Sequence, residues 1–167
     1  MNFSGNCLSI TTEGPVAWVT IDNPPANVIT TALFEELAAL AVEVAADDEL
    51  KVVVYKSANP DFFLAHFDVS AIIEMATDGR EAAAEVLVGF HGMLQTIREM
   101  DKVTIGQIEG RIGGGGAEIA MNFDMRFGVR GKTRFNQMEV PLGILPGGSG
   151  TQMLPRLVGR GRAMELI

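Results

Sequence analysis

Two short segments near the N-terminus are rich in apolar and β-branched residues, a pattern typical of strands. They are Leu8–Thr12 and Val16–Asp22, and the turn residues Glu13-Gly14-Pro15 separate them. We therefore expect a β-hairpin. The second strand should end at Asn23-Pro24-Pro25, because proline has no N–H group to donate to a neighbouring strand.

The next two segments change from a helical to a strand pattern. A helix is expected to begin near Thr30 or Thr31 and to end at Asp47-Asp48. Its apolar positions follow helical spacing and are Leu33, Leu37, Leu40 and Val44. The continuous apolar run Val52–Tyr55 then predicts a strand that is buried on both faces.

The rest of the chain alternates in the same way and predicts an α/β fold with at least partly parallel pairing. We expect helices from about Val69, over Glu81–Met100, Ala117–Met121 and Thr151–Leu157, and strands over Val103–Ile108 and Met125–Val129. The apolar face of the long helix should carry Leu87, Phe90, Leu94 and Ile97. No linker or repeat divides residues 1–167, so we expect a single domain. The last segment, Gly161–Ile167, starts a helix without a stop signal, from which we expect a chain truncated at its C-terminus.

Composition narrows the class of protein. The chain has 167 residues, of which 47% are hydrophobic and 20% charged, as in a globular domain. A net charge of -8 argues against a nucleic-acid partner. One cysteine, Cys7, and two histidines provide neither a disulfide framework nor a metal-binding cluster. No apolar run is long enough for a membrane span and the first residues do not resemble a signal peptide, so we expect a cytoplasmic protein.

The glycine run Gly113–Gly116 is the strongest local feature of the sequence. A strand, a glycine turn and a helix start present free N–H groups, which favours an anion or oxyanion site. A flexible loop or tight helix packing is equally open from this run alone. A phosphate-binding loop would need Gly-Lys-Ser/Thr, whereas Ala117-Glu118 follows here, and a dinucleotide fold would place its acidic residue further downstream.

Two glutamates lie close to apolar or glycine-rich sequence. Glu118 follows the glycine run, and Glu139 is the single charge in Phe135–Pro141. Paired carboxylates can divide general acid and base work. Taken alone, however, the two residues are better explained as solvated surface glutamates. His91, which borders the apolar face of its helix, is interpreted as structural.

Several motifs together resemble one known family. Their order and spacing are similar to those of the crotonase (enoyl-CoA hydratase/isomerase) superfamily from about Leu8 to the end of the chain. The segments that carry the resemblance are Pro25–Val28, Phe63–Val69, Lys102–Gly110 with Gly114–Ala120, Asp124–Arg126, Phe135–Gly143, Pro146–Thr151, Leu157–Gly159 and Ala163–Leu166.

The resemblance implies a crotonase/ClpP-like spiral of ββα units that lacks the C-terminal helical trimerisation segment. It also implies that the backbone N–H groups of Phe67 and Gly115 hold a thioester oxygen, and that Glu118 and Glu139 are catalytic. The remaining positions expected to contact the acyl-CoA substrate are Ala26, Val28, Ala65, His66, Asp68 and Gly114. The partner is an acyl-CoA thioester, no separate cofactor or metal is implied, and a homo-oligomer (a trimer or a dimer of trimers) is expected.

Both glutamates together favour hydration of a 2-enoyl-CoA, because family members that only isomerise a double bond commonly keep the second one alone. Another reaction of the superfamily is the nearest alternative: isomerisation, acyl-CoA hydrolysis or decarboxylation. A non-catalytic protein that binds CoA esters is an alternative of another class.

Overall fold

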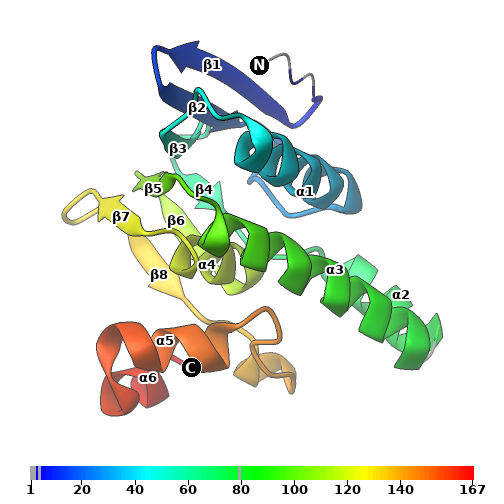
Figure 1. The fold of residues 1–167 in the computed structure, drawn as a ribbon. Coiled ribbons are helices and arrows are strands. Elements are labelled where there is room, and N and C mark those ends of the chain that lie inside the picture. The colour runs from blue at the N-terminus through cyan, green and yellow to red at the C-terminus, as the bar shows by residue number, and fades with distance from the viewer. Residues whose placement is uncertain (1–2, 4, 79) are drawn as a thin grey trace.

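The computed structural model describes residues 3, 5–78 and 80–167 of the chain (Figure 1). The strands are β1 (Leu8–Glu13), β2 (Val16–Ile21), β3 (Val52–Ser57), β4 (Phe62–Leu64), β5 (Val103–Ile108), β6 (Arg111–Gly113), β7 (Met125–Gly128) and β8 (Arg134–Asn136). The helices are α1 (Thr31–Ala46), α2 (Val69–Asp78), α3 (Arg80–Glu99), α4 (Gly114–Met121), α5 (Gly150–Val158) and α6 (Arg160–Leu166), with a 3-10 turn η1 (Val140–Leu142).

The larger sheet contains the strands that the sequence predicts. Its order is β1-β2-β3-β5-β7, with β1 antiparallel to β2 and the other neighbours parallel. Val16 pairs with Val52, and Val52 in turn pairs with Val103. The predicted hairpin and the partly parallel pairing are therefore both confirmed.

A second, smaller sheet has the order β4-β6-β8 and is parallel throughout. Each of its strands has only three residues, which is too short for a periodic pattern to identify. Each also follows one strand of the larger sheet directly and leads toward a helix, so that β3-β4, β5-β6 and β7-β8 begin successive ββα units. An isolated bridge between Ile29 and Phe67 adds the segment before α1 to the same series. The expected spiral of ββα units is confirmed.

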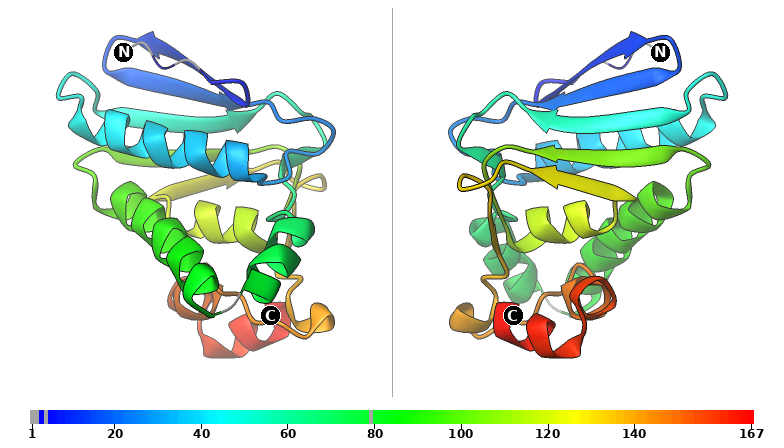
Figure 2. Two further views of the ribbon diagram at one scale, coloured as in Figure 1. Left: turned by 90° about the vertical axis from the view of Figure 1, so that its right-hand side faces the viewer. Right: turned by 90° about the vertical axis from the view of Figure 1, so that its left-hand side faces the viewer.

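The units are stacked from one end of the molecule to the other. Figures 1 and 2 show the β1-β2 hairpin at one end, α5 and α6 at the opposite end, and α4 between them. Helices α1 and α3 cover the same face of the larger sheet. Among the described residues, no helix combines the length and apolar character that crossing a bilayer requires.

The helices bury the faces that their sequences predict, with one exception. Thr30 caps α1 by accepting a hydrogen bond from the Leu33 amide, and the four predicted apolar positions of that helix are buried. On α3, the three later predicted positions are buried, but Leu87 is 45% exposed and Met93 takes its place in the core. Leu87 instead faces Gly147: a Cβ added to Gly147 would lie 3.6 Å from the Leu87 side chain.

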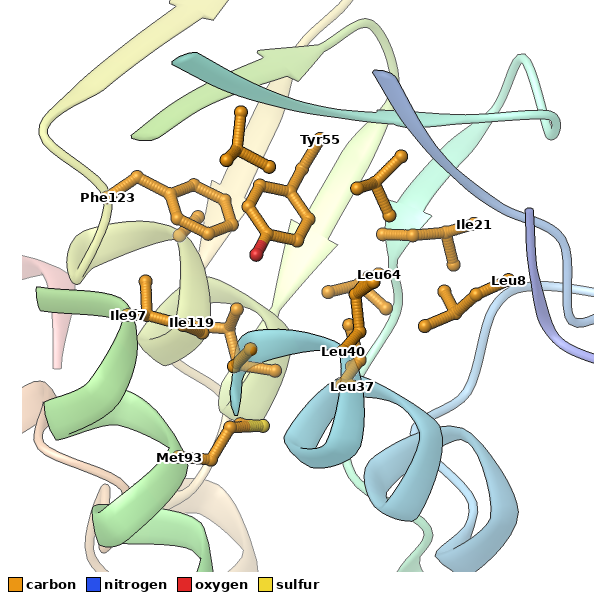
Figure 3. Close-up of a cluster of buried hydrophobic side chains, with 14 of the residues drawn as sticks. Leu8, Ile21, Leu37, Leu40, Tyr55, Leu64, Met93, Ile97, Ile119 and Phe123 are labelled. Carbon is orange, nitrogen blue, oxygen red and sulfur yellow. The ribbon is translucent and has the colours of Figure 1, made fainter. Parts of the chain in front are cut away.

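The core lies between the larger sheet and helices α1, α3 and α4 (Figure 3). At its centre, the Tyr55 ring stacks on Phe123 with 4.6 Å between ring centroids. Every residue of α4 is buried. That helix packs directly on β4, because a Cβ added to Gly116 would lie 2.6 Å from both the Leu64 Cβ and its carbonyl oxygen.

This contact predicts opposite effects for two glycine-to-alanine substitutions in helices. Gly116→Ala should lower the free energy of unfolding by about 2 kcal/mol, because the new methyl group meets backbone that cannot move away easily. Gly92→Ala, in α3 with open space around it, should raise it by about 1 kcal/mol, because alanine is the better helix former. Urea unfolding measures both, and equal effects of the two substitutions would contradict the close packing.

Candidate active site

The start of α4 forms one side of the site. Gly113 is extended and ends β6, whereas Gly114 has a φ of 45°, in the region that favours glycine. Gly115 is the second residue of the helix, so its N–H group has no partner within the helix. Because the whole helix is buried, this N–H group lies in a place where water is largely excluded.

The backbone of Phe67 forms the other side. Ile29 donates to the His66 carbonyl at 2.8 Å and accepts from the Asp68 amide at 3.0 Å. These two bonds use the residues on either side of Phe67 and leave its own N–H outside the bridge. A Cβ added to Gly115 would lie 3.6 Å from the Phe67 nitrogen, so the two predicted oxyanion N–H groups come from adjacent segments.

A buried asparagine fixes the loop before α1 against this corner. Asn27 is fully buried with a φ of 53°, donates to the Phe63 carbonyl at 3.0 Å and accepts from the Ala65 amide. It therefore holds its half-buried neighbours Ala26 and Val28 beside β4. In the sequence, Asn27 stands out only as part of a motif, and no local signal predicts its role.

A cavity of about 100 Å³ opens beside the two N–H groups. Its walls come from the two oxyanion segments, the start of α2 and the η1 region, through His66, Phe67, Val69, Ile72, Gly114, Gly115, Met138, Glu139, Leu142 and Ile144. Five of the predicted site residues thus meet at one cavity. The other five, which are Ala26, Val28, Ala65, Asp68 and Glu118, do not line it.

Glu118 lies in the next turn of α4 and is only 3% exposed. Its Oε1 accepts a hydrogen bond from the Gly150 amide at 2.7 Å. The pKa of this carboxyl is raised to about 7, chiefly by burial and to a smaller extent by the nearby charge of Glu139, whereas the amides of Gly150 and Gly148 act in the opposite direction.

Glu139, at the cavity wall, is 7% exposed. Burial raises its pKa, against the effect of its own amide and that of Met138. The Gln137 side-chain amide is oriented by its hydrogen-bond partners, so that its nitrogen donates to Glu139 Oε2 at 2.9 Å. Gln137, also buried, was missed by the sequence analysis as a site residue. The interpretation of Glu118 and Glu139 as solvated surface glutamates is wrong.

The remaining predicted residues contact the Phe67 and Gly115 segments or the elements next to them. His66 Nδ1 lies 2.7 Å from the Phe67 carbonyl oxygen. Asp68 accepts from the Ser70 amide at 2.9 Å and thereby caps the start of α2. The Phe67 side chain packs against Phe34 and Phe90. Within the part of the chain that the structure describes, no three His, Cys, Asp or Glu side chains are grouped as metal ligands would be.

The loop at residues 146–150 covers Glu118. A Cβ added to Gly148 would lie 2.5 Å from Glu118 Oε2 and 2.4 Å from the Phe90 ring, so any larger residue there would force one of these side chains to move. Ser149 has a φ of 101°, which is strained for a residue with a side chain. The sequence analysis recognised this glycine-rich run as part of a motif but did not connect it to the glutamate.

Comparisons with known proteins identify the family to which the chain belongs. Residues 11–167 match the sequence profile of the family described as enoyl-CoA hydratase/isomerase. The chain is 38% identical to the short-chain-enoyl-CoA hydratase of Clostridium acetobutylicum, over 93% of this chain and 58% of that protein. It is 35% identical to the fatty acid oxidation complex subunit alpha of Aliivibrio fischeri, over 91% of this chain and 22% of that protein.

A solved structure gives the same result for the fold. The crystal structure of the enoyl-CoA hydratase from Bacillus anthracis matches with a TM-score of 0.86 and 28% identity, over 97% of this chain and 62% of that one. The protein therefore belongs to the enoyl-CoA hydratase/isomerase family, that is, to the crotonase superfamily. It spans about three fifths of the length of the Clostridium and Bacillus proteins.

The buried Glu118 predicts a defined pH dependence of stability. Its pKa rises from 4.5 to about 7 on folding, so the folded state binds the proton more tightly and loses stability as the pH rises between these values. Glu118→Gln removes this titration. The variant should therefore gain about 3 kcal/mol relative to the wild type between pH 4.5 and pH 8, in urea unfolding at each pH. Glu165→Gln, at an exposed position, is the control, and a constant difference between Glu118→Gln and wild type would contradict the buried, raised pKa.

Proposed function

We propose that this site adds water across the double bond of a 2-enoyl-CoA. The observation that supports the proposal is the combination of two adjacent backbone N–H groups with two buried glutamates whose pKa values are both raised. An oxyanion site alone would suit several reactions of acyl-CoA thioesters. The second carboxyl, close enough to raise the pKa of the first, favours hydration.

The N–H groups of Phe67 and Gly115 act on the thioester carbonyl. When a nucleophile adds to the β-carbon, electrons move toward the carbonyl oxygen and negative charge develops there. Fixed donors stabilise this charge without having to reorient. The helix dipole of α4, whose positive end lies at Gly114 and Gly115, contributes in the same direction.

The two carboxyls divide the proton transfers. A pKa near 7 suits Glu118 to take a proton from water as the water oxygen bonds to the β-carbon. Glu139, in its protonated form, then delivers a proton to the α-carbon. The sum is one water added across the double bond. Glu118 ends neutral and Glu139 ends charged, and the transfer of one proton from Glu118 to Glu139, directly or through solvent, restores the starting state.

The substrate follows from the same features. The cavity is lined mainly by apolar side chains next to the oxyanion corner, as an acyl chain requires. The names of the Clostridium and Bacillus proteins support an enoyl-CoA substrate. The homo-oligomer, the cytoplasmic location and the absence of a separate cofactor remain predictions.

The proposal is tested with crotonyl-CoA. The chain should consume the enoyl thioester, as followed by its ultraviolet absorbance, with an acid limb of the pH profile near 7 from Glu118. Glu118→Gln and Glu139→Gln should each lower kcat by about 100-fold or more, because each removes one proton transfer.

Glu165→Gln, a glutamate exposed on α6, serves as the matched control and should leave the rate unchanged. Far-UV circular dichroism establishes that each variant is folded. If the folded chain consumed crotonyl-CoA at the same rate with and without Glu118 and Glu139, hydration by this site would be wrong. Turnover of another CoA thioester in its place would favour a different reaction of the superfamily.

A further inference from the structure

Helix α3 holds the loop at residues 146–150 over Glu118 through a contact between residues that are far apart in the sequence. His91 Nε2 lies 2.7 Å from the Gly147 carbonyl oxygen. Because a carbonyl only accepts, Nε2 must carry the hydrogen, which it does in one neutral tautomer and in the charged form. One turn of α3 therefore supplies two contacts to this loop, since Phe90 also packs against Gly148.

The Gly147 carbonyl that His91 contacts belongs to a peptide unit whose N–H group, that of Gly148, lies on the side of Glu118. The Gly147 carbonyl and the Gly148 N–H belong to the same planar peptide. Among the described residues the cis bond is at Pro24-Pro25, so this peptide is trans and its C=O and N–H point in opposite directions. The Gly148 backbone lies against the Glu118 side chain, because a Cβ added there would lie 2.5 Å from Glu118 Oε2. With the carbonyl turned toward His91, the opposite N–H faces the side of the carboxylate, and this amide lowers the pKa of Glu118.

The other side of the loop is fixed by a second chain of hydrogen bonds that also begins on α3. Arg98 donates to Asn122 Oδ1 at 2.6 Å, and Asn122 Nδ2 donates to Ser149 Oγ at 2.9 Å and to the Glu118 carbonyl at 2.7 Å. Ser149 keeps its strained φ of 101° between these two supports. A strained residue persists only where its surroundings determine its conformation, so the loop is held in place rather than merely covering the site.

We propose that His91 is a positioning residue, which orients the Gly147-Gly148 peptide so that its N–H group points at the Glu118 carboxylate. The geometry of the described residues carries this inference; its consequence for catalysis rests on the hydration proposed above. His91 does not touch the reacting atoms. It acts through one peptide unit on the acid-base group.

Without the His91 contact, the peptide can rotate and the charged form of Glu118 loses a donor, so the pKa of Glu118 should rise. The other groups that act on this carboxyl are unchanged by the substitution: Glu139 by its charge and Gly150 by its amide. The direction of the shift is thus opposite to the one that a simple opening of the loop to water would cause, because hydration lowers the pKa of a buried carboxyl.

The experiment measures the Glu118 carboxyl directly in the full chain. Carbon-13 NMR of glutamate labelled at the carboxyl carbon gives the titration, and Glu118→Gln identifies the signal. His91→Leu, which removes the donor at similar size, should raise the pKa of Glu118 by about half a pH unit or more. His91→Gln, whose amide nitrogen can replace Nε2, should keep the wild-type value. His91→Ala provides a second variant without the donor.

The outcomes separate this inference from the proposed function. An unchanged or lowered pKa of Glu118 in His91→Leu and His91→Ala would overturn the positioning role, whatever the activity. A raised pKa in these variants, restored in His91→Gln, would support it even if the wild type failed to hydrate crotonyl-CoA. If the wild type is active, the acid limb of its pH profile should move upward by the same amount in His91→Leu and not in His91→Gln.

Discussion

The close approach of α4 to β4 is the constraint on which the site depends. A side chain at Gly116 would collide with Leu64, and one at Gly115 would come within 3.3 Å of the Phe67 Cβ. Because these positions lack side chains, the first N–H groups of the helix lie against the Phe67 backbone. The same approach buries the whole helix, including Glu118 one turn further on. The arrangement of the predicted oxyanion donors and the burial of Glu118 therefore both depend on this packing contact.

Burying two carboxyls opposes stability at the atoms where the proposed chemistry needs them. Removing a charged carboxylate from water costs free energy that hydrogen bonds offset only in part. The amides of Gly148 and Gly150 at Glu118, and Gln137 at Glu139, offset some of the cost. The pKa of Glu118 settles near 7, where both protonation states are populated at neutral pH. A fully satisfied carboxylate would be more stable and a poorer base.

The sequence predicted the parts of this molecule that repeat over many residues. The larger sheet and α1 have long periodic patterns, whereas the three-residue strands of the smaller sheet do not. Local pattern also favoured solvated surface positions for Glu118 and Glu139. Glu118 is buried by the packing of α4 and by the distant loop at residues 146–150, whose Gly150 amide donates to it. Glu139 lies beside Gln137 and Gly114. Asn27, Gln137 and His91 were given no chemical role for the same reason. Each of them makes a contact to backbone or to a side chain that no periodicity reveals.

Helix α3 shows how one element can serve the core and the site together. Leu94 and Ile97 pack into the core, and Phe90 joins that core to the underside of Gly148. The residues that neighbour Phe90 on the side of the loop point out of the core. Leu87 therefore lies beside Gly147, and His91 contacts the Gly147 carbonyl. Because the helix is fixed by its buried face, its contacts with the loop have little freedom to shift. The core packing of α3 therefore also fixes the position of the loop that covers the Glu118 carboxyl.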